Sequence, residues 1–422
     1  MSKRWCLWIF LLIFCIGCTT VDSDTTKEIQ VLQKEQTILP EAYDARQHGK
    51  WASVKNQGSS VNCWAYASLT ALELSLRPKW DDTFSVQHMI SDWDEWNDQD
   101  GGMYTMSMAY LLSWRGPVSQ RTNKDVPYHV KEIRILQEQN FEEIKEAVMA
   151  FGAVESSFYS SFLEGDLNRS PWYNAQTASY CCMQEHTSNH EIVIIGWDDA
   201  YPKENFCVPP KHDGAFLCLN SWGEDFGDQG YFYVSYEDCS IGKDAVVYSS
   251  VDRADPSQIL YETDSCGWIG QIGYECDTLW YANRYQAVGD GEIEAVGFYV
   301  LDSGSRYEVF WVDDWKDVHD FSKKQKVASG TVEWTGFVSV PLSEKQSVKE
   351  KDSFAVMVKM VSPTGKAQAA AEFQANGLKK VDISDGEGYI SWNGETWERV
   401  EESLDCNICL KAYGRNLLPA AS

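Results

Sequence analysis

The chain has 422 residues, a formal net charge of −27 and 44% hydrophobic residues. Its length exceeds that of one ordinary domain, so we expect two domains with substantial apolar cores. Binding to nucleic acid requires clustered Lys and Arg, and the strong negative charge therefore argues against a nucleic-acid partner.

Residues 1–18 have the pattern of a signal peptide. Lys3 and Arg4 precede an apolar run that is too short to span a bilayer. The run ends in Cys15-Ile16-Gly17-Cys18, which resembles the lipobox of bacterial lipoproteins, although Leu is usual where Cys15 stands. We therefore expect an exported protein that is anchored to the bacterial envelope by a lipid on Cys18, or that is secreted if this cysteine is not acylated.

The remaining chain divides into four parts that differ in composition and in apolar periodicity. Residues 19–38 are polar and lack apolar periodicity, so we interpret them as a tether. Residues 39–253 mix helical and strand-like patterns, whereas residues 254–416 contain short strands only. Residues 417–422 form a tail. We therefore predict two folded domains, 39–253 and 254–416, joined by a polar, proline-containing linker.

The first predicted domain has helices followed by strands, which favours an α+β fold with two lobes that meet across a cleft. The segments that carry this prediction are helices at 64–76, 103–114 and 140–151 and strands at Ile192–Trp197, Ala215–Leu219 and Tyr231–Tyr236.

The second predicted domain shows short strands separated by turn residues, with no helical pattern between them, as is typical of an antiparallel, jelly-roll-like β-sandwich. The predicted strands are Ala295–Leu301, Tyr307–Val312, Phe337–Leu342, Phe354–Val361, Tyr389–Trp392 and Ile408–Tyr413.

Cys63 stands at the start of a predicted helix. Apolar or small side chains follow it at Ala65, Leu69, Leu72 and Leu76, the spacing of one buried helical face. Free N–H groups and the positive end of the dipole at a helix start favour a thiolate over a thiol. Cys63 is therefore a candidate nucleophile, and the alternative is a buried, inert cysteine.

Two downstream residues provide what a reactive cysteine needs. His190 immediately precedes a predicted buried strand, so it is a candidate base. Asn220 follows another apolar strand, and its side chain can accept a hydrogen bond from one ring nitrogen of His190 and so orient the ring. Trp222 can shield that bond from water. A structural histidine beside an apolar strand is the alternative interpretation.

The order of these residues resembles that of the papain-like cysteine peptidases. The resemblance covers about 215 residues and comprises Gln57, the Cys63-Trp64-Ala65 run, His190 before its strand, and Asn220-Ser221-Trp222-Gly223. Leu39-Pro40 with Val54-Lys55-Asn56-Gln57, and the pair Gly101-Gly102, agree with it.

This resemblance implies a mechanism. Cys63 would attack as a thiolate paired with protonated His190, and Asn220 would orient the histidine. Gln57 and the backbone N–H of Cys63 would form the oxyanion hole. The expected substrate-binding residues are Gly101, Gly102 and Trp222. The expected substrates are proteins or peptides.

The chain also departs from this family. Ser60-Val61-Asn62 replaces the usual Cys-Gly-Ser, so the family's disulfide beside the nucleophile is missing. The sequence therefore does not determine the shape of this loop. By the same resemblance, Cys181 or Cys182 would pair with Cys239. The tether is shorter than the family's inhibitory prosegment, so we do not expect that form of zymogen control.

We expect no metal or cofactor. The acidic loop Asp92–Asp100 lacks the regular ligand alternation of an EF-hand, and Cys406 and Cys409 have no second ligand pair of suitable spacing for zinc. Cys218 lies in an apolar run, so we expect it to be an unpaired core residue, while the other pairings stay open.

The second domain resembles the lectin-like domain that follows papain-like modules in some exported bacterial proteins. The motifs are Gly267-Trp268, Trp280-Tyr281-Ala282-Asn283, Ala295-Val296-Gly297-Phe298-Tyr299 and Asn407-Ile408-Cys409-Leu410-Lys411-Ala412-Tyr413. Its tryptophans either stack on sugar rings of a cell-surface glycan or belong to the core. These are Trp268, Trp280, Trp392 and Trp397.

The sequence thus predicts an exported cysteine endopeptidase with an accessory β-sandwich, and glycan binding is the role considered for that sandwich. Two alternatives stay open. A cell-wall amidase also uses Cys-then-His order, although Gln57 and the Asn-Ser-Trp-Gly motif favour papain-like chemistry. A surface adhesin on an inactive papain-like scaffold is the second alternative, and the intact Cys, His, Asn and Gln set argues against it.

Overall fold

A computed structural model describes residues 38–93, 101–162, 166, 169–375 and 381–417. The predicted signal peptide with Cys18, the tether up to residue 37, most of the acidic loop and the tail from residue 418 lie outside the described residues. Residues 39–422 form one compact unit, separate from residues 1–38, and only this unit is discussed below. Within the described ranges, no helix has both the length and the apolar character needed to cross a membrane.

The three predicted helices are confirmed, with ends that differ by at most two residues. The α-helices are α1 Cys63–Leu76, α2 Val86–Ser91, α3 Tyr104–Leu112, α4 Phe141–Phe151 and α5 Val400–Ser403. Short 3-10 helices lie at Ala45–His48, Lys203–Asn205 and Val318–Lys323. Helix α4 is capped at its start by Asn140, whose side chain accepts from the backbone N–H of Glu143, and at its end by Gly152 with φ +99°.

The strands of the first half include all three that the sequence predicts there. They are β1 Ala42–Asp44, β2 Tyr128–Ile135, β3 Val154–Phe158, β4 Tyr173–Asn174, β5 Ser179–Tyr180, β6 His190–Asp198, β7 Ala215–Leu219, β8 Tyr231–Ser235 and β9 Lys243–Arg253. His190 is the first residue of β6, whereas the sequence places it just before the strand.

The second half is almost entirely β-structure. Its strands are β10 Gln258–Tyr261, β11 Gly270–Gly273, β12 Thr278–Gln286, β13 Gly291–Val300, β14 Ser305–Val312, β15 Gln325–Val332, β16 Thr335–Val348, β17 Ser353–Val361, β18 Gln368–Phe373, β19 Gly388–Ser391, β20 Glu398–Arg399, β21 Cys406–Ile408 and β22 Leu410–Asn416. The predicted strand Ile408–Tyr413 is therefore two strands, which separate at Cys409 and join different sheets. The short α5 also corrects the expectation of no helix, because one turn is too short to show an apolar period.

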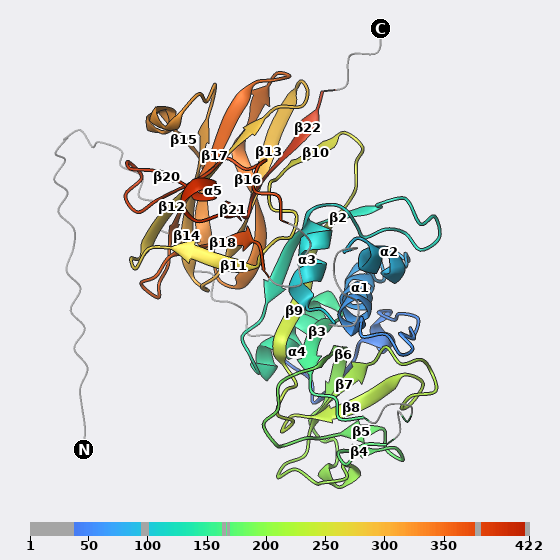
Figure 1. The fold of residues 1–422 in the computed structure, drawn as a ribbon. Helices are drawn as coiled ribbons and strands as arrows, with labels where there is room; N and C mark the ends of the chain where they lie inside the picture. The colour runs from blue at the N-terminus through green and yellow to red at the C-terminus, as the bar shows by residue number, and fades with distance from the viewer. Residues whose placement is uncertain (1–37, 94–100, 163–165, 167–168, 376–380, 418–422) are drawn as a thin grey trace, which may run out of the picture. The chain divides into compact units, whose positions relative to one another are not determined.

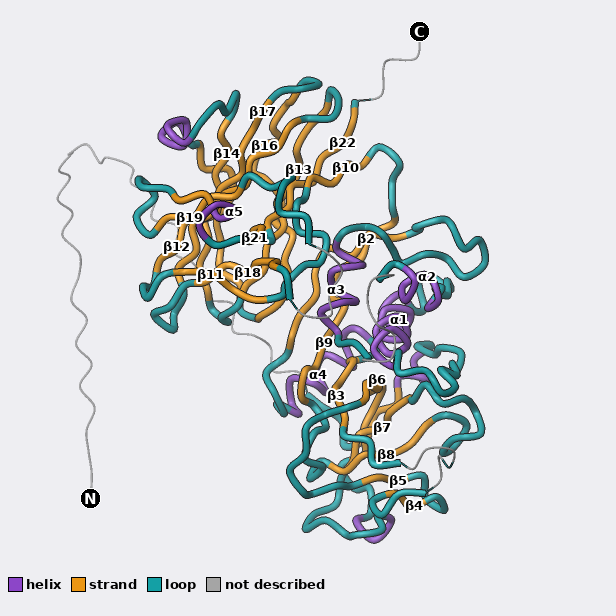
Figure 2. The backbone as a smooth tube through the Cα atoms, viewed as in Figure 1, coloured by secondary structure: helices purple, strands orange, loops and turns teal. Residues whose placement is uncertain are grey.

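Three sheets organise the chain (Figures 1 and 2). The largest has the order β10-β22-β13-β16-β2-β9-β3-β6-β7-β8-β5-β4, with β1 beside β6. The others are β15-β14-β17-β12-β19-β20 and β11-β18-β21. Apolar side chains of β13 and β16 share one core with those of β12, β14 and β17, so the second half is a β-sandwich, as predicted.

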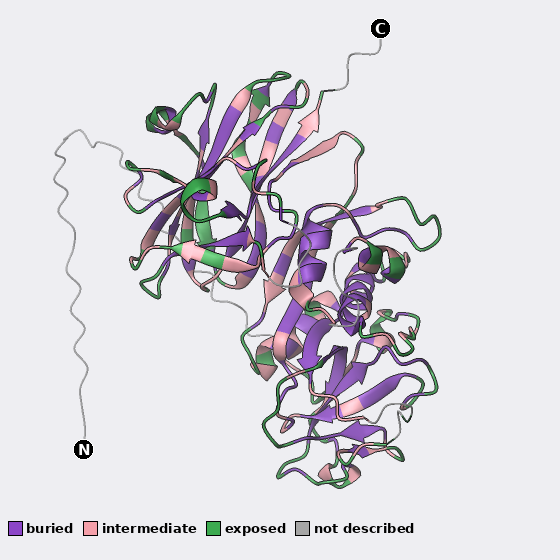
Figure 3. Ribbon diagram, viewed as in Figure 1, coloured by how far each residue is buried: buried purple, intermediate pink, exposed green. Residues whose placement is uncertain are grey.

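Strand β6 separates two apolar cores of the first half, and it is buried along nearly its whole length (Figure 3). Successive side chains of a strand point to opposite faces. Accordingly, Val193 and Ile195 join the core around helix α1, whereas Ile192 and Ile194 join a core formed with β7 and β8. This burial on both faces explains the continuous apolar run from Ile192 onward.

The large sheet continues from the first half of the chain into the second. Strand β16 pairs antiparallel with β2, with Thr335 opposite Ile135 and Val338 opposite Glu132. The Thr335 hydroxyl donates to the carbonyl oxygen of Ile135 at 2.7 Å. The two halves are therefore joined by backbone pairing in addition to the covalent linker.

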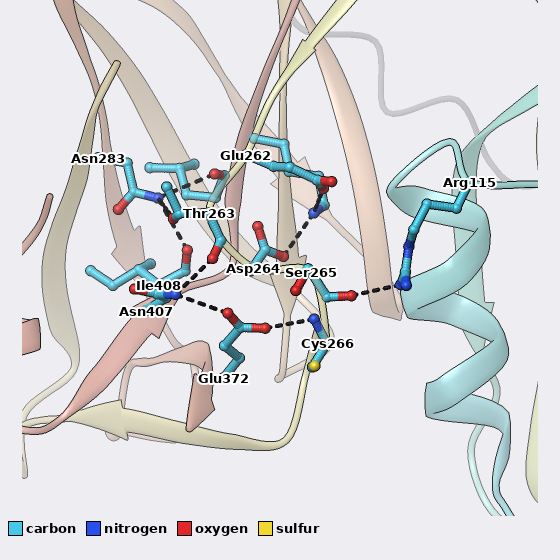
Figure 4. A network of polar contacts seen from close by, with 12 residues as sticks. Arg115, Glu262, Thr263, Asp264, Ser265, Cys266, Asn283, Glu372, Asn407 and Ile408 are labelled. Carbon is cyan, nitrogen blue, oxygen red and sulfur yellow. Dashed lines mark hydrogen bonds and ion pairs between the residues drawn. The ribbon is translucent and has the colours of Figure 1, made fainter. Parts of the chain in front are cut away.

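A buried polar network holds the start of the second half (Figure 4). The Lys411 ammonium lies 2.8 Å from an Asp264 carboxylate oxygen, and both residues are almost fully buried. The amide nitrogen of Asn407 donates to Glu372 at 2.8 Å, and the backbone N–H of Cys266 donates to the same carboxylate at 2.6 Å. A guanidinium N–H of Arg115, which follows α3, donates to the Ser265 carbonyl oxygen at 2.6 Å. The network thus fixes residues 264–266 against the first half.

Candidate active site

Cys63 is the first residue of α1, as the sequence predicts, and only 7% of its surface is exposed. The backbone N–H groups of Cys63, Trp64 and Glu191 lie at its sulfur and lower its pKa. Burial and the negative charge of Glu191 act in the opposite direction and raise the pKa to about 12. The expected lowering at the helix start is therefore present but outweighed, because the thiol is desolvated.

His190, Asn220 and Trp222 form one contact group. The Nε2 atom of His190 lies 2.8 Å from Oδ1 of Asn220. An amide oxygen only accepts, so Nε2 carries the hydrogen and Nδ1 is left as the basic nitrogen. The Trp222 ring stacks on the imidazole with ring centres 4.7 Å apart. Burial lowers the pKa of His190 to about 4, although the bond to Asn220 opposes this shift.

The Gln57 side chain is held at both ends of its amide. Its Nε2 donates to the Ser60 carbonyl oxygen at 2.6 Å, and its Oε1 accepts from the Ser221 hydroxyl at 2.6 Å. The backbone N–H of Gln57 donates to the Ser221 carbonyl oxygen at 2.8 Å. One N–H of the amide is thus used locally and the other is left for a ligand. Ser221 is a positioning residue that the sequence analysis missed, although it lies inside the Asn-Ser-Trp-Gly motif.

The loop before Cys63 closes without the disulfide usual in its relatives. The backbone N–H and the hydroxyl of Ser60 both donate to the Gln57 carbonyl oxygen, at 3.2 and 2.9 Å. Val61 is exposed and Asn62 precedes the first residue of α1. Hydrogen bonds between Gln57 and Ser60 therefore close the loop whose shape the sequence left open.

Gly101 and Gly102 line the same cleft as His190. A Cβ atom at Gly102 would lie 2.5 Å from Nε1 of Trp64, so the indole of Trp64 packs directly on this backbone. Gly101 has φ +75°, which favours glycine. Both glycines leave a bare stretch of backbone at the edge of the cleft.

These residues surround one cleft with a volume of about 1170 Å³. Six of the seven predicted site residues line it, namely Gln57, Cys63, Gly101, Gly102, His190 and Trp222. Asn220 is the seventh and lies behind His190, 3% exposed. The described parts of the chain contain no group of three or more His, Cys, Asp or Glu side chains arranged to hold a metal ion.

Two further cysteines lie in contact beyond the cleft. The Cys182 and Cys239 thiols lie within hydrogen-bonding reach of each other. The backbone N–H of Cys239 donates to the Cys182 carbonyl oxygen at 2.8 Å. Of the two partners considered for Cys239, the geometry therefore favours Cys182 over Cys181. Cys218 is fully buried in β7.

Comparison with known sequences agrees with this geometry. Residues 39–249 match the papain family cysteine protease domain, and residues 260–414 match the lectin like domain. A viral cathepsin of Antheraea pernyi nuclear polyhedrosis virus is 26% identical over 225 residues, which are 49% of this chain and 63% of the relative. The thiol protease aleurain of Arabidopsis thaliana is 27% identical over 221 residues, 47% of this chain and 56% of that protein. The chain thus spans less than two thirds of these relatives.

Solved structures extend the similarity to both halves. The Clostridial cysteine protease Cwp84 after propeptide cleavage superposes with a TM-score of 0.80 and 26% identity, covering 89% of this chain and 99% of that one. A structure of the cysteine protease and lectin-like domains of Cwp84, a surface layer associated protein of Clostridium difficile, gives a TM-score of 0.79 at 26% identity, with 90% and 89% covered. The chain therefore belongs to the papain family of cysteine proteases and carries a lectin-like domain behind the peptidase domain.

Proposed function

We propose that this protein is a cysteine endopeptidase that hydrolyses peptide bonds through Cys63, His190, Asn220 and Gln57. The observation that carries the proposal is the hydrogen bond from His190 Nε2 to Asn220, which leaves Nδ1 of a cleft-lining histidine free to exchange a proton with the cleft-lining thiol. Family membership supports the same reaction class.

In the proposed reaction, Nδ1 of His190 takes the Cys63 proton and the sulfur attacks the substrate carbonyl carbon. Burial disfavours either charge alone, so thiolate and imidazolium form together, each stabilised by the other. The backbone N–H of Cys63 and the remaining N–H of Gln57 Nε2 hold the oxyanion. His190 then gives its proton to the leaving amine, which leaves a thioester. Water attacks the thioester, His190 accepts its proton, and the released thiolate regains it.

The test is hydrolysis of a denatured protein by purified protein that lacks residues 1–18. We expect cleavage of the substrate and labelling of Cys63 by an epoxysuccinyl inhibitor, while Cys63→Ala does neither. Cys218→Ala is the matched control, because it removes another buried thiol outside the cleft. Full activity of Cys63→Ala would refute the mechanism, and a wild type that is neither active nor labelled would favour the adhesin alternative.

Glycan binding by the second half is a second candidate function, and the exposure of Trp392 favours it. This indole is 58% exposed, and Gly394 in the same loop packs against the ring of Trp280. Trp280 and Trp397 are only partly buried in a small aromatic core, whereas Trp268 packs against a core to which both halves contribute. We expect full-length Cys63→Ala protein to bind a glycan array. No loss of binding in Trp392→Ala would remove that indole from the site.

We further propose export, with a lipid on Cys18 as the anchor and simple secretion as the alternative. The leader pattern of residues 1–18 supports this, and the relative Cwp84 is described as surface layer associated. Mass spectrometry of the mature N-terminus in the producing bacterium tests it. A diacylglyceryl mass on Cys18 would support the anchor, and an unmodified mature chain in the medium would support secretion.

A further inference from the structure

The wall of the cleft beside Cys63 contains acidic groups that the proposed mechanism does not use. Ser157 of β3 lies opposite Glu191 of β6 in the sheet, and Lys243 of β9 pairs with Ser157 on its other side. Ser157, Glu191 and Asp244 all line the cleft. They therefore form one patch contributed by three neighbouring strands.

Glu191 is 7% exposed, and only one of its oxygens has a hydrogen-bond partner. Its Oε1 lies 3.1 Å from the Ser157 hydroxyl, while Oε2 has no partner among the described residues. A buried carboxylate oxygen without a partner is costly, because water is lost and nothing replaces it. The site thus lacks a hydrogen-bond donor at this oxygen.

The patch also has fewer hydrogen-bond donors than its two carboxylates require. The Ser157 hydroxyl lies 3.1 Å from Glu191 and 2.9 Å from an Asp244 oxygen, but it has one hydrogen and can donate to only one of them. Two ionised carboxylates therefore cannot both be satisfied by Ser157. Either Glu191 carries a proton, or an incoming donor supplies the missing hydrogens.

Among the described residues, no Lys or Arg side chain of the protein itself pairs with the carboxylates of Glu191 and Asp244. Lys243 adjoins Asp244 and lines the cleft, yet it forms no ion pair with any described residue. No arginine lies among the described residues that line the cleft. When Glu191 is ionised, the ligand that would satisfy the patch is therefore a cation with several N–H donors.

We propose that Ser157, Glu191 and Asp244 form a subsite that selects a lysine or arginine side chain of the peptide substrate. This inference rests on the proposed peptidase function and specifies its substrate class. Arginine has five N–H donors in a planar fork, which suits two carboxylates that share one hydroxyl.

The subsite also predicts a pH dependence of selectivity. Burial, followed by the charges of Glu155 and Asp244, raises the pKa of Glu191. A cationic side chain binds the ionised form better, so the preference for arginine should increase as pH rises. The titratable groups around Glu191 are Cys63 on α1, Tyr104 on α3, Glu155 on β3, His190 on β6, and Lys243, Asp244 and Tyr248 on β9. The titration of these groups also changes catalysis itself. Because this change affects two substrates alike, it cancels in the ratio of their kcat/KM values.

The test uses fluorogenic peptides that carry arginine or its neutral isostere citrulline at each position on either side of the cleaved bond. At one position we expect kcat/KM for arginine to exceed that for citrulline by about tenfold or more at pH 8, and by less at pH 5. In Glu191→Gln and in Asp244→Asn the ratio should fall severalfold. The matched control is Glu185→Gln, because Glu185 is an exposed carboxylate that lines the same cleft. It should keep the wild-type ratio.

The outcomes separate the subsite from the peptidase function. A ratio near one at every position, or a ratio that neither subsite variant changes, would overturn the subsite while leaving peptidase activity intact. If the wild type cleaves no peptide, calorimetric binding of the arginine and citrulline peptides to Cys63→Ala decides the question. Tighter binding of arginine would then support the subsite without turnover, and equal binding would refute it.

Discussion

At the scale of single residues, the orientation of the Gln57 amide determines whether its free N–H can bind the oxyanion. The Ser221 hydroxyl holds its oxygen and the Ser60 carbonyl holds its nitrogen, each at 2.6 Å, so Ser221 is one of two groups that fix where the free amide N–H points. We predict that Ser221→Ala lowers kcat about tenfold with little change in KM, because an oxyanion donor acts mainly in the transition state.

Ser59→Ala is the matched control for this prediction. Ser59 lies in the same loop and is exposed, so its loss should leave kcat within about twofold. Steady-state kinetics on one peptide substrate measures both variants. A Ser221→Ala enzyme with unchanged kcat, or with a change only in KM, would mean that Gln57 does not depend on this hydroxyl.

The identity of the site residues could be predicted because each stands at the end of a strongly patterned segment. Cys63 begins a long, mostly apolar helix that is buried on nearly all sides, and Asn220 follows the apolar strand β7. The sign of the pKa shift of Cys63 could not be predicted, because it depends on burial by segments far along the chain and on Glu191. Local sequence shows the helix start but not the depth of the site.

At the scale of elements, strand β3 is unusual because it is fully buried yet half polar. Its sequence is Val-Glu-Ser-Ser-Phe, and Glu155 is 0% exposed. The Ser68 hydroxyl donates to Glu155 at 2.7 Å and the Tyr248 hydroxyl at 3.1 Å. Burial nevertheless raises the pKa of Glu155 from 4.5 to about 7.

This raised pKa predicts a stability change with a definite sign. Between pH 4.5 and 7 the folded state keeps the Glu155 proton and the unfolded state loses it, so the free energy of unfolding falls as pH rises. Across that window the loss is about 3 kcal/mol. We expect chemical denaturation at pH 4.5 and 7.5 to show a loss of stability that is smaller in Glu155→Gln than in the wild type by this amount, because Glu191 and Asp264 also have raised pKa values and contribute in both proteins.

The exposed carboxylate Glu395 provides the control, since Glu395→Gln removes the same charge without burial. Its stability difference from the wild type should stay nearly constant over the same range. If Glu155→Gln also differs from the wild type by a constant amount, Glu155 does not keep a proton in the folded protein.

Strands β6 and β7 could be predicted from their apolar runs, whereas β3 could not. Glu155, Ser156 and Ser157 give no apolar alternation, and their burial is stabilised by hydroxyl groups on other elements. The patch of Ser157, Glu191 and Asp244 could not be predicted from the sequence for a related reason. Its members come from β3, β6 and β9, and only the sheet order brings them together.

At the scale of the whole molecule, the two halves share one sheet through β2 and β16. Gly336 lies at this junction with φ +128°, and a Cβ atom there would lie 2.1 Å from the Ile133 carbonyl oxygen. We predict one calorimetric unfolding transition for the wild type. In Gly336→Ala the clash prevents pairing, so we expect two transitions, the lower one shifted down by roughly 5 °C.

Gly365→Ala separates the clash from the backbone cost. Gly365 also has a positive φ, +87°, but nothing lies within 4 Å of an added Cβ. This variant should keep a single transition with a small shift. Equal behaviour of the two variants would show that the β2–β16 pairing does not couple the halves. The sequence indicated a linker near residue 254 but not this pairing, because strand partners leave no local pattern.

The shared sheet also has a consequence for synthesis of the chain. The hydroxyl of Thr335 contacts the carbonyl of Ile135, 200 residues earlier. One edge of β2 therefore stays unpaired during synthesis until the residues of β16 have been made. An unpaired strand edge recruits other strands. A product that stops between the two halves would keep this edge open and be prone to aggregation. The lectin-like half therefore covers this edge of β2 in the folded chain.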